Sequence, residues 1–149
     1  MVSKIKKDPT VTKQQRMVID IIHTANWLDE RISKVLKGFG ITHPQFNILK
    51  NIQAAHPEPL SVKEIKDTIM FTNSDVTRLV DRLVKKELLC RDTCPENRRK
   101  MDVSITEKGV DMLDQILPEL KKTFNNFFET KVSLEDALKT SEILRRIRQ

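Results

Sequence analysis

A chain of 149 residues is long enough for one globular domain with appended helices, and its 27 lysines and arginines exceed its 21 aspartates and glutamates by six charges. Three glycines and no tyrosine argue against an all-β fold with many tight turns, and two cysteines are too few for a disulfide framework. The sequence shows neither a signal-peptide pattern nor an apolar run of membrane-spanning length, so we expect a cytoplasmic protein without a membrane partner.

The first predicted element is a long helix from about Thr12 to Lys37, which Gly38 and Gly40 end. Its apolar residues recur at nearly heptad spacing and form one stripe along the helix. A small domain cannot cover so long a stripe, so we expect it to pack against a second copy; packing into an intramolecular bundle is the alternative. The stripe consists of Val18, Ile21, Ile22, Ala25, Leu28, Ile32, Val35 and Leu36.

Two capping boxes mark the beginnings of the next two helices. Thr42 and Gln45 open a helix that tolerates Pro44 in its first turn and ends at the proline-containing stretch 56–59. Ser61 and Glu64 open a short third helix over residues 62–69. The second helix is expected to turn Phe46, Leu49 and Ile52 toward the core.

A fourth helix is predicted over residues 73–86, with Thr72 or Asn73 as its N-cap. Apolar residues at i, i+3, i+4, i+7 and i+8 give this helix one apolar face, and polar residues occupy the other. A short helix, a tight turn and an amphipathic helix follow one another in the order of a helix-turn-helix, whose second helix reads DNA. The apolar face consists of Val76, Leu79, Val80, Leu83 and Val84, and the opposite face of Ser74, Arg78, Asp81 and Lys85.

A basic hairpin is predicted directly after this helix, over residues 88–105. Its first strand runs over 88–93, and the alternation from Met101 to Ile105 predicts the second strand. The loop between them contains Arg98, Arg99 and Lys100, which places three cations at the tip of the hairpin. A basic hairpin beside a helix that fits a groove makes double-stranded DNA the leading partner.

Two more helices complete the predicted fold. Thr106 caps a helix over about 107–130, in which Pro118 is expected to cause a kink, and Ser133 with Asp136 opens the last helix, over about 134–148. Their apolar residues add to the surface that a homodimer would cover. The predicted fold class is mainly α with a small β-wing: a winged helix-turn-helix domain over 41–106, flanked by N- and C-terminal helices (1–40 and 107–149) that form a dimerisation region.

Five segments, in this order and at this spacing, carry a family resemblance: residues 41–49 (ITHPQFNIL), 60–65 (LSVKEI), 76–86 (VTRLVDRLVKK), 95–100 (PENRRK) and 103–109 (VSITEKG). They resemble the MarR family of winged helix-turn-helix transcription regulators over nearly the whole chain. The resemblance implies a homodimer that binds a pseudo-palindromic operator, with repression and release by a small ligand or an oxidant as expected properties. The sequence departs at two positions: Asn97 stands where the wing usually has an acidic residue, and Glu87 where the preceding turn usually has a glycine.

The N-terminal half of a recognition helix normally enters the major groove. Ser74, Thr77 and Arg78 are therefore the first candidates for reading bases. Arg78 has the donors to make two hydrogen bonds to a guanine, whereas Asp75 is expected mainly to favour the helix start electrostatically.

Other cations suit the DNA backbone and the minor groove. Lys63, Arg82 and Lys85 are placed for phosphates, while Arg98 and Arg99 suit a narrow, A·T-rich minor groove. The complete candidate set for DNA binding is Ser61, Lys63, Asn73, Ser74, Asp75, Thr77, Arg78, Arg82, Lys85, Arg98, Arg99 and Lys100.

Two further kinds of site are hypotheses. The resemblance implies an effector pocket where the first two helices meet the winged domain, with His23, Trp27 and Phe46 as candidates, although plain core or dimer packing explains the same residues. Cys90 and Cys94 suggest a thiol-based redox sensor as an alternative function. Four extended residues span about 13 Å and a disulfide requires Cα atoms within about 7 Å, so an intrachain bond would need a sharp bend before Pro95.

No histidine or cysteine spacing typical of a metal site occurs in the sequence, nor does a glycine-rich phosphate loop or a nucleophile motif. We therefore expect neither a metal, nor a cofactor, nor an enzyme. A remaining alternative is a dimeric interaction module that has lost operator binding, for which Asn97 is the one hint in the sequence.

Overall fold

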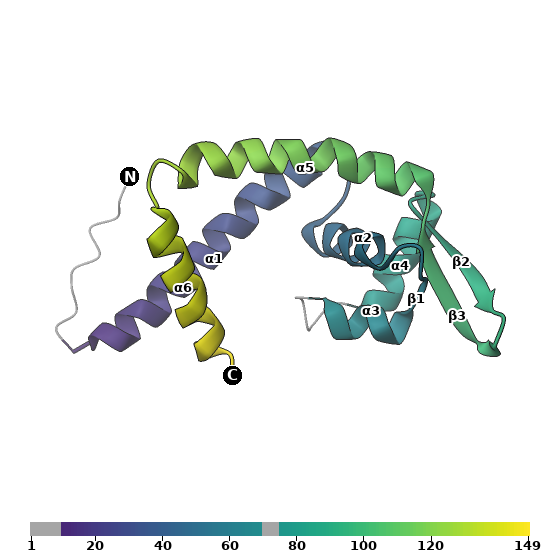
Figure 1. The fold of residues 1–149 in the computed structure, drawn as a ribbon, viewed down its shortest axis with the longest axis horizontal. Coiled ribbons are helices and arrows are strands. Elements are labelled where there is room, and N and C mark those ends of the chain that lie inside the picture. Colours follow the sequence, from purple (N-terminus) through teal and green to yellow (C-terminus); the bar gives the residue numbers. More distant parts are fainter. Residues whose placement is uncertain (1–9, 70–74) are drawn as a thin grey trace.

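The computed structural model describes residues 10–69 and 75–149, except the side chains of residues 98, 99, 126 and 127. Its elements are α1 (Lys13–Gly38), α2 (His43–Ala55), β1 (Leu60–Ser61), α3 (Val62–Thr68), α4 (Val76–Lys85), β2 (Leu89–Cys94), β3 (Asn97–Ile105), α5 (Glu107–Phe128) and α6 (Leu134–Ile147). The helices α1, α5 and α6 form an open frame at one end of the molecule, and α2 to β3 gather at the other (Figure 1). The fold is mainly α with a small three-stranded sheet, as predicted.

The predicted capping boxes form in α2 and α3, and α1 begins with a third one that was not predicted. In α1 and α2 the hydroxyls of Thr12 and Thr42 accept from the N–H of Gln15 and Gln45, whose side chains accept from the N-cap N–H. Between these two helices Gly40 has a φ of 72°, a left-handed conformation that glycine adopts without steric cost. These local signals account for the close agreement between predicted and observed helix ends in this half of the chain.

The helix α4, the predicted recognition helix, begins later than predicted. Its N-cap is Asp75, whose Oδ1 accepts from the N–H of Arg78 at 3.2 Å, so a cap at Thr72 or Asn73 is wrong. Aspartate caps a helix as well as asparagine does, and Asp75 directly precedes Val76, the first residue of the apolar stripe. Thr72 and Asn73 themselves lie outside the described residues.

The sheet has the order β1-β3-β2, with all neighbours antiparallel. The hairpin pairs Leu89 with Ile105 and Arg91 with Val103, and β1 pairs Leu60 with the same Val103 from the other side. The sequence did not predict β1, because two residues are too short to show an alternating pattern. This strand attaches the base of the wing to the beginning of α3.

The wing's cations do not lie at the tip of the hairpin. The turn falls at residues 95 and 96, and β3 already begins at Asn97. The register changes from Thr93 opposite Met101 to Cys94 opposite Asn97, which leaves residues 98–100 as an insertion in β3. Proline favours the first central position of a turn, and Pro95 therefore moves the turn ahead of the basic residues.

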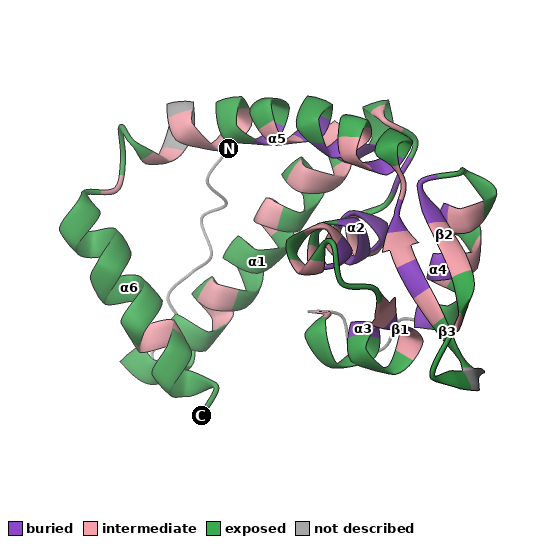
Figure 2. Ribbon diagram, turned by 45° about the vertical axis from the view of Figure 1, so that its right-hand side comes forward, coloured by how far each residue is buried: buried purple, intermediate pink, exposed green. Residues whose placement is uncertain are grey.

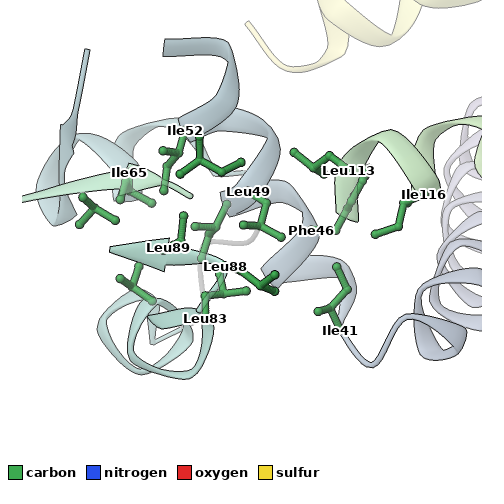
Figure 3. Packing of buried hydrophobic residues seen from close by; sticks show 14 of the residues in the cluster. Ile41, Phe46, Leu49, Ile52, Ile65, Leu83, Leu88, Leu89, Leu113 and Ile116 are labelled. Carbon is green, nitrogen blue, oxygen red and sulfur yellow. The ribbon is translucent and has the colours of Figure 1, made fainter. Parts of the chain in front are cut away.

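One buried cluster joins the helix-turn-helix, the sheet and the first half of α5 (Figure 3). Leu113 and Ile116 of α5 pack into it, so the core extends past residue 106. The stripe of α4 belongs to it as predicted, with three residues fully buried and two partly buried. The cluster includes Leu36, Phe46, Ile48, Leu49, Ile52, Ile65, Val76, Val80, Leu83, Leu88, Leu89, Val103, Leu113 and Ile116.

The outer helices show the opposite pattern of burial (Figure 2). α1 buries only Leu36 and α6 buries no residue against the described part of the chain. Large apolar side chains are exposed on both helices: Met17, Val18 and Ile22 on α1, and Leu134, Leu138 and Ile147 on α6.

Candidate nucleic-acid interface

α4 presents a polar face to solvent because its apolar face is anchored in the core. Val76, Val80 and Leu83 are buried on one side, while Thr77 and Arg78 are exposed on the other. Arg82 and Lys85, predicted as phosphate contacts, are also exposed. A helix whose apolar face is held in the core and whose exposed face carries hydrogen-bond donors has the shape required for entry into a DNA groove.

Arg78 is paired within its own helix turn. Its Nε lies 3.2 Å from Oδ2 of Asp75, and the two side chains remain 78% and 57% exposed. They border a shallow hollow of about 280 Å³ together with Leu79 and Arg82. Asp75 therefore has two roles, as the predicted charge at the helix start and as an ion-pair partner of the best base-reading candidate.

A second hollow, of about 630 Å³, lies between the beginning of α3 and the wing. Ser61, the N-cap of α3, borders it together with Lys63 and Glu64 of α3, and Lys100 borders it from β3. Nζ of Lys100 lies 3.6 Å from Oε2 of Glu64, with the two side chains 45% and 52% exposed. The pairing of β1 with β3 creates this proximity, which brings three predicted DNA-binding residues together at one site.

The carboxylate of Glu64 is held in its charged form. The hydroxyl and the backbone N–H of Ser61 both donate to its Oε2, the latter at 2.8 Å. These hydrogen bonds, first that of the hydroxyl, together with nearby Lys100, lower the pKa of Glu64 below 4.5 despite an opposing desolvation effect. Glu64 is thus an anion on a surface for which sequence reasoning predicted cations.

An ion pair also connects α4 to the wing. Nη1 of Arg91 on β2 donates to Oδ1 of Asp81 on α4, and the arginine side chain is largely buried. Its Nε is buried without a hydrogen-bond partner among the described residues, so the contact with Asp81 is the main compensation for burying this charge. Sequence reasoning missed this pair because only the folded hairpin brings the two residues together.

The turn between α4 and β2 contains Glu87 at the position where the family usually has a glycine. The N–H of Leu88 donates to Leu83 O and that of Glu87 to Val84 O, which is the Schellman pattern of a helix C-terminus. This pattern requires a left-handed residue, and Glu87 adopts it with φ 62°. Its side chain accepts from Nζ of Lys108 at 2.8 Å, and this contact lowers the pKa of Glu87.

Some predicted residues are not described in full. Asn73 and Ser74 lie outside the described residues, and Arg98 and Arg99 are placed on β3 without their side chains. Their predicted roles in base reading and minor-groove binding stay predictions.

The predicted effector candidates occupy three different settings. Phe46 is a core residue, 6% exposed, whereas His23 is exposed on α1. Trp27 is partly buried, and the guanidinium of Arg31 stacks over its ring at 4.0 Å. Phe46 therefore serves core packing, and an effector role for these residues stays a hypothesis.

Cys90 and Cys94 both lie on β2, four residues apart along an extended strand, and both are free and partly buried. The sharp bend that an intrachain disulfide would need is absent between them, because β2 is continuous from Leu89 to Cys94. A redox response would have to use each thiol separately or between chains.

The described residues contain neither a metal-binding cluster nor a membrane-spanning helix. Residues 10–69 and 75–149 contain no cluster of three or more metal-ligating side chains. Within the same ranges, every helix falls short of the length or the apolarity that crossing a membrane requires.

The part of the chain that carries this surface is similar to known proteins. The MarR family model matches residues 41–101, from the beginning of α2 into β3. Residues 41–101 form a MarR family domain. This MarR domain contains both hollows and the ion pairs that border them.

Relatives of this chain extend the match from the MarR domain to the outer helices. The HTH-type transcriptional regulator MhqR of Bacillus subtilis is 27% identical over 135 residues, which are 91% of either chain. The structure of Sco3205, a MarR family transcriptional regulator from Streptomyces coelicolor in complex with DNA, has a TM-score of 0.80 at 22% identity, with 93% of this chain and 88% of that chain covered. A mutant MarR from E. coli complexed with operator DNA has a TM-score of 0.75 at 22% identity, with 86% and 91% covered. These relatives are transcriptional regulators, not enzymes.

Proposed function

We propose that this chain is a homodimeric, sequence-specific transcriptional regulator that binds a pseudo-palindromic operator. In this proposal α4 of each protomer enters the major groove and the wing follows into the adjacent minor groove. The observation that carries the proposal is the polar face of α4, with Arg78 exposed beside a basic wing and an apolar back buried in the core. Related folds that bind DNA, Sco3205 and the E. coli MarR mutant, support it.

A homodimer supplies the second half-site. The exposed apolar side chains of α1 and α6 have no cover in the described chain, and an apolar hollow of about 470 Å³ lies where α5 turns into α6. A second copy would bury these surfaces and hold two recognition helices at a fixed spacing. We therefore expect half-sites about one helical turn, or about 34 Å, apart.

The proposal is tested by selecting duplexes from a random pool with the purified protein and measuring binding by fluorescence anisotropy. Arg78→Ala should weaken binding to the selected duplex at least tenfold, because a bidentate arginine–guanine contact contributes about 1–3 kcal/mol of discrimination and the proposed homodimer makes two such contacts. Arg148→Ala, which removes the same charge from the exposed C-terminal end, is the matched control and should bind as wild type does. If Arg78→Ala binds the selected duplex normally, the assignment of base reading to Arg78 is wrong.

We also propose repression as the regulatory outcome, since a dimer on an operator that overlaps a promoter blocks polymerase. Transcription in vitro from a template carrying the selected duplex at the promoter should fall on addition of the protein. Release by a small effector stays part of the proposal, and mass spectrometry of the purified protein would detect a retained molecule. Increased transcription in the first assay would instead indicate an activator.

A further inference from the structure

The beginnings of the two helices of the helix-turn-helix differ from those of the other helices. Of the six helices described, α1, α2, α3, α5 and α6 have a hydroxyl N-cap, whereas α4 has the carboxylate of Asp75. The capping boxes of α1 and α2 use glutamine at the third helical position, whereas that of α3 uses Glu64. Two carboxylates thus stand on the surface proposed to meet a polyanion.

The fold does not require the negative charge of either residue. The amide oxygens of Gln15 and Gln45 accept from their N-cap N–H groups at 2.8 and 3.0 Å, in the same way as Glu64 accepts from Ser61 at 2.8 Å. Asparagine caps helices about as well as aspartate. A neutral side chain would therefore complete both helix starts, so capping alone does not explain why both residues are carboxylates.

Each carboxylate holds a cation that the proposed function assigns to DNA. Glu64 lies 3.6 Å from Nζ of Lys100, and Asp75 lies 3.2 Å from Nε of Arg78. Both pairs are about half exposed or more, and exposed ion pairs are weak, so DNA can displace them. After displacement, each carboxylate remains beside the phosphates and repels them.

We propose that Glu64 and Asp75 are specificity-determining residues, whose carboxylates take the place of DNA phosphate on Lys100 and Arg78 in the free protein. DNA without the matching bases offers these two cations only phosphate. Exchanging a carboxylate for a phosphate replaces one anion by another, so the binding free energy improves little. An operator gives Arg78 a bidentate contact with a base and offers Lys100 of the wing a narrow minor groove with a stronger negative potential, and these contacts compensate for the lost pairs and the remaining repulsion. The carboxylates therefore weaken non-specific binding more than operator binding. This inference rests on the proposed function and adds how the same surface discriminates between operator and other DNA.

The test uses Glu64→Gln and Asp75→Asn in the full-length protein, with Glu142→Gln and Asp111→Asn as controls. The controls remove the same charges from exposed positions on α6 and α5. Two duplexes are titrated: the one that wild type selects from a random pool, and a scrambled duplex of equal composition. Circular dichroism checks that each variant keeps its helices.

For each test variant we expect binding to the scrambled duplex to tighten about fivefold and binding to the selected duplex to tighten less than twofold. The specificity ratio then falls about threefold, and the slope of log affinity against log salt steepens by about one per freed cation. The control variants should keep the wild-type ratio and slope. All four variants can also be compared on immobilised heparin, a polyanion without bases, where only the two test variants should elute at higher salt than wild type.

A double-mutant cycle establishes whether Glu64 acts through Lys100. In a Lys100→Gln background, Glu64→Gln should change binding to the scrambled duplex by less than half of its effect in wild type. Additive effects, or an unchanged specificity ratio in a wild type that selects duplexes well, would overturn this inference alone. A wild-type protein that binds no duplex better than the scrambled one would overturn the proposed function as well.

Discussion

Glu87 shows how a single residue can depart from what its backbone conformation favours. The Schellman turn after α4 needs a left-handed residue, and a glutamate there carries a steric cost that glycine does not. The contact of Glu87 with Lys108 offsets part of this cost. Both groups are exposed, so the offset is small.

Glu87→Gly and Glu87→Ala separate the two effects. Both remove the contact with Lys108, but only glycine also relieves the left-handed strain. We expect the free energy of unfolding of Glu87→Gly, measured by urea denaturation, to be about 1 kcal/mol higher than that of Glu87→Ala. Equal stabilities would show that the backbone at residue 87 is not strained.

The lowered pKa of Glu64 predicts a pH dependence of stability. Because the pKa of Glu64 is lower in the folded chain than its ordinary value of 4.5, the unfolded chain binds a proton more readily. The stabilisation by this carboxylate is therefore present above pH 4.5 and lost as pH falls below it.

Denaturation of wild type and Glu64→Gln from pH 7 to pH 3 measures this contribution. The difference in their free energies of unfolding should shrink toward pH 3, because wild type loses the stabilisation and the variant has none to lose. Glu142→Gln controls for the removal of one exposed carboxylate. A difference that stays constant with pH, or one that Glu142→Gln reproduces, would contradict the role of the Ser61 hydrogen bonds.

At the scale of elements, α5 approaches the wing closely at Gly109. A Cβ at this position would lie 2.3 Å from the carbonyl oxygen of Leu88 and 2.8 Å from Cγ1 of Ile105. Leu88 and Ile105 lie at the base of the hairpin, where backbone and core side chains cannot easily shift. Glycine at position 109 therefore determines how near α5 packs to the wing.

Gly109→Ala should lower the free energy of unfolding by about 2–3 kcal/mol, because the added methyl group overpacks this contact. Gly38→Ala is the matched control, since no described atom lies within 4 Å of a Cβ there and alanine favours a helix. We expect that control to be neutral or stabilising by up to about 1 kcal/mol in thermal or chemical denaturation. Similar losses in both variants would mean that the contact at Gly109 is looser than described.

At the scale of the whole molecule, the core and the uncovered surface are separated. The buried cluster lies in the winged part and the first half of α5, while α1 and α6 expose apolar side chains (Figure 2). Leu138 is 63% exposed on α6. A polar substitution there leaves the core of one chain untouched and alters only the surface assigned to the proposed dimer.

Leu138→Glu should raise the dissociation constant of the dimer at least tenfold, because burial of a leucine contributes about 1.5–3 kcal/mol and each dimer contains two. Ala54→Glu introduces the same side chain at an exposed position on α2, away from the apolar surface of α1 and α6, and should leave the dimer intact. Sedimentation or light scattering over a range of concentrations measures both. A Leu138→Glu protein that dimerises as wild type does would place the interface elsewhere.

Local signals in the sequence predicted much of this fold. The spacing from Val76 to Val84 predicted the buried face of α4, and capping boxes predicted the beginnings of α2 and α3. The beginning of α4 was misplaced, because several consecutive residues before Val76 are acceptable caps and only the folded chain shows which one is used. The hairpin tip was misplaced because a register shift depends on the partner strand.

The sequence by itself determined the helices, their apolar faces and the basic character of the wing, since periodicity, caps and charge act within one or two helical turns. Only the tertiary structure decided that β1 joins the sheet and that Glu64 meets Lys100, because these partners are far apart in the chain. It likewise decided that Asp81 on α4 meets Arg91 on β2. Such pairs depend on how close packing aligns whole elements, which no local pattern encodes.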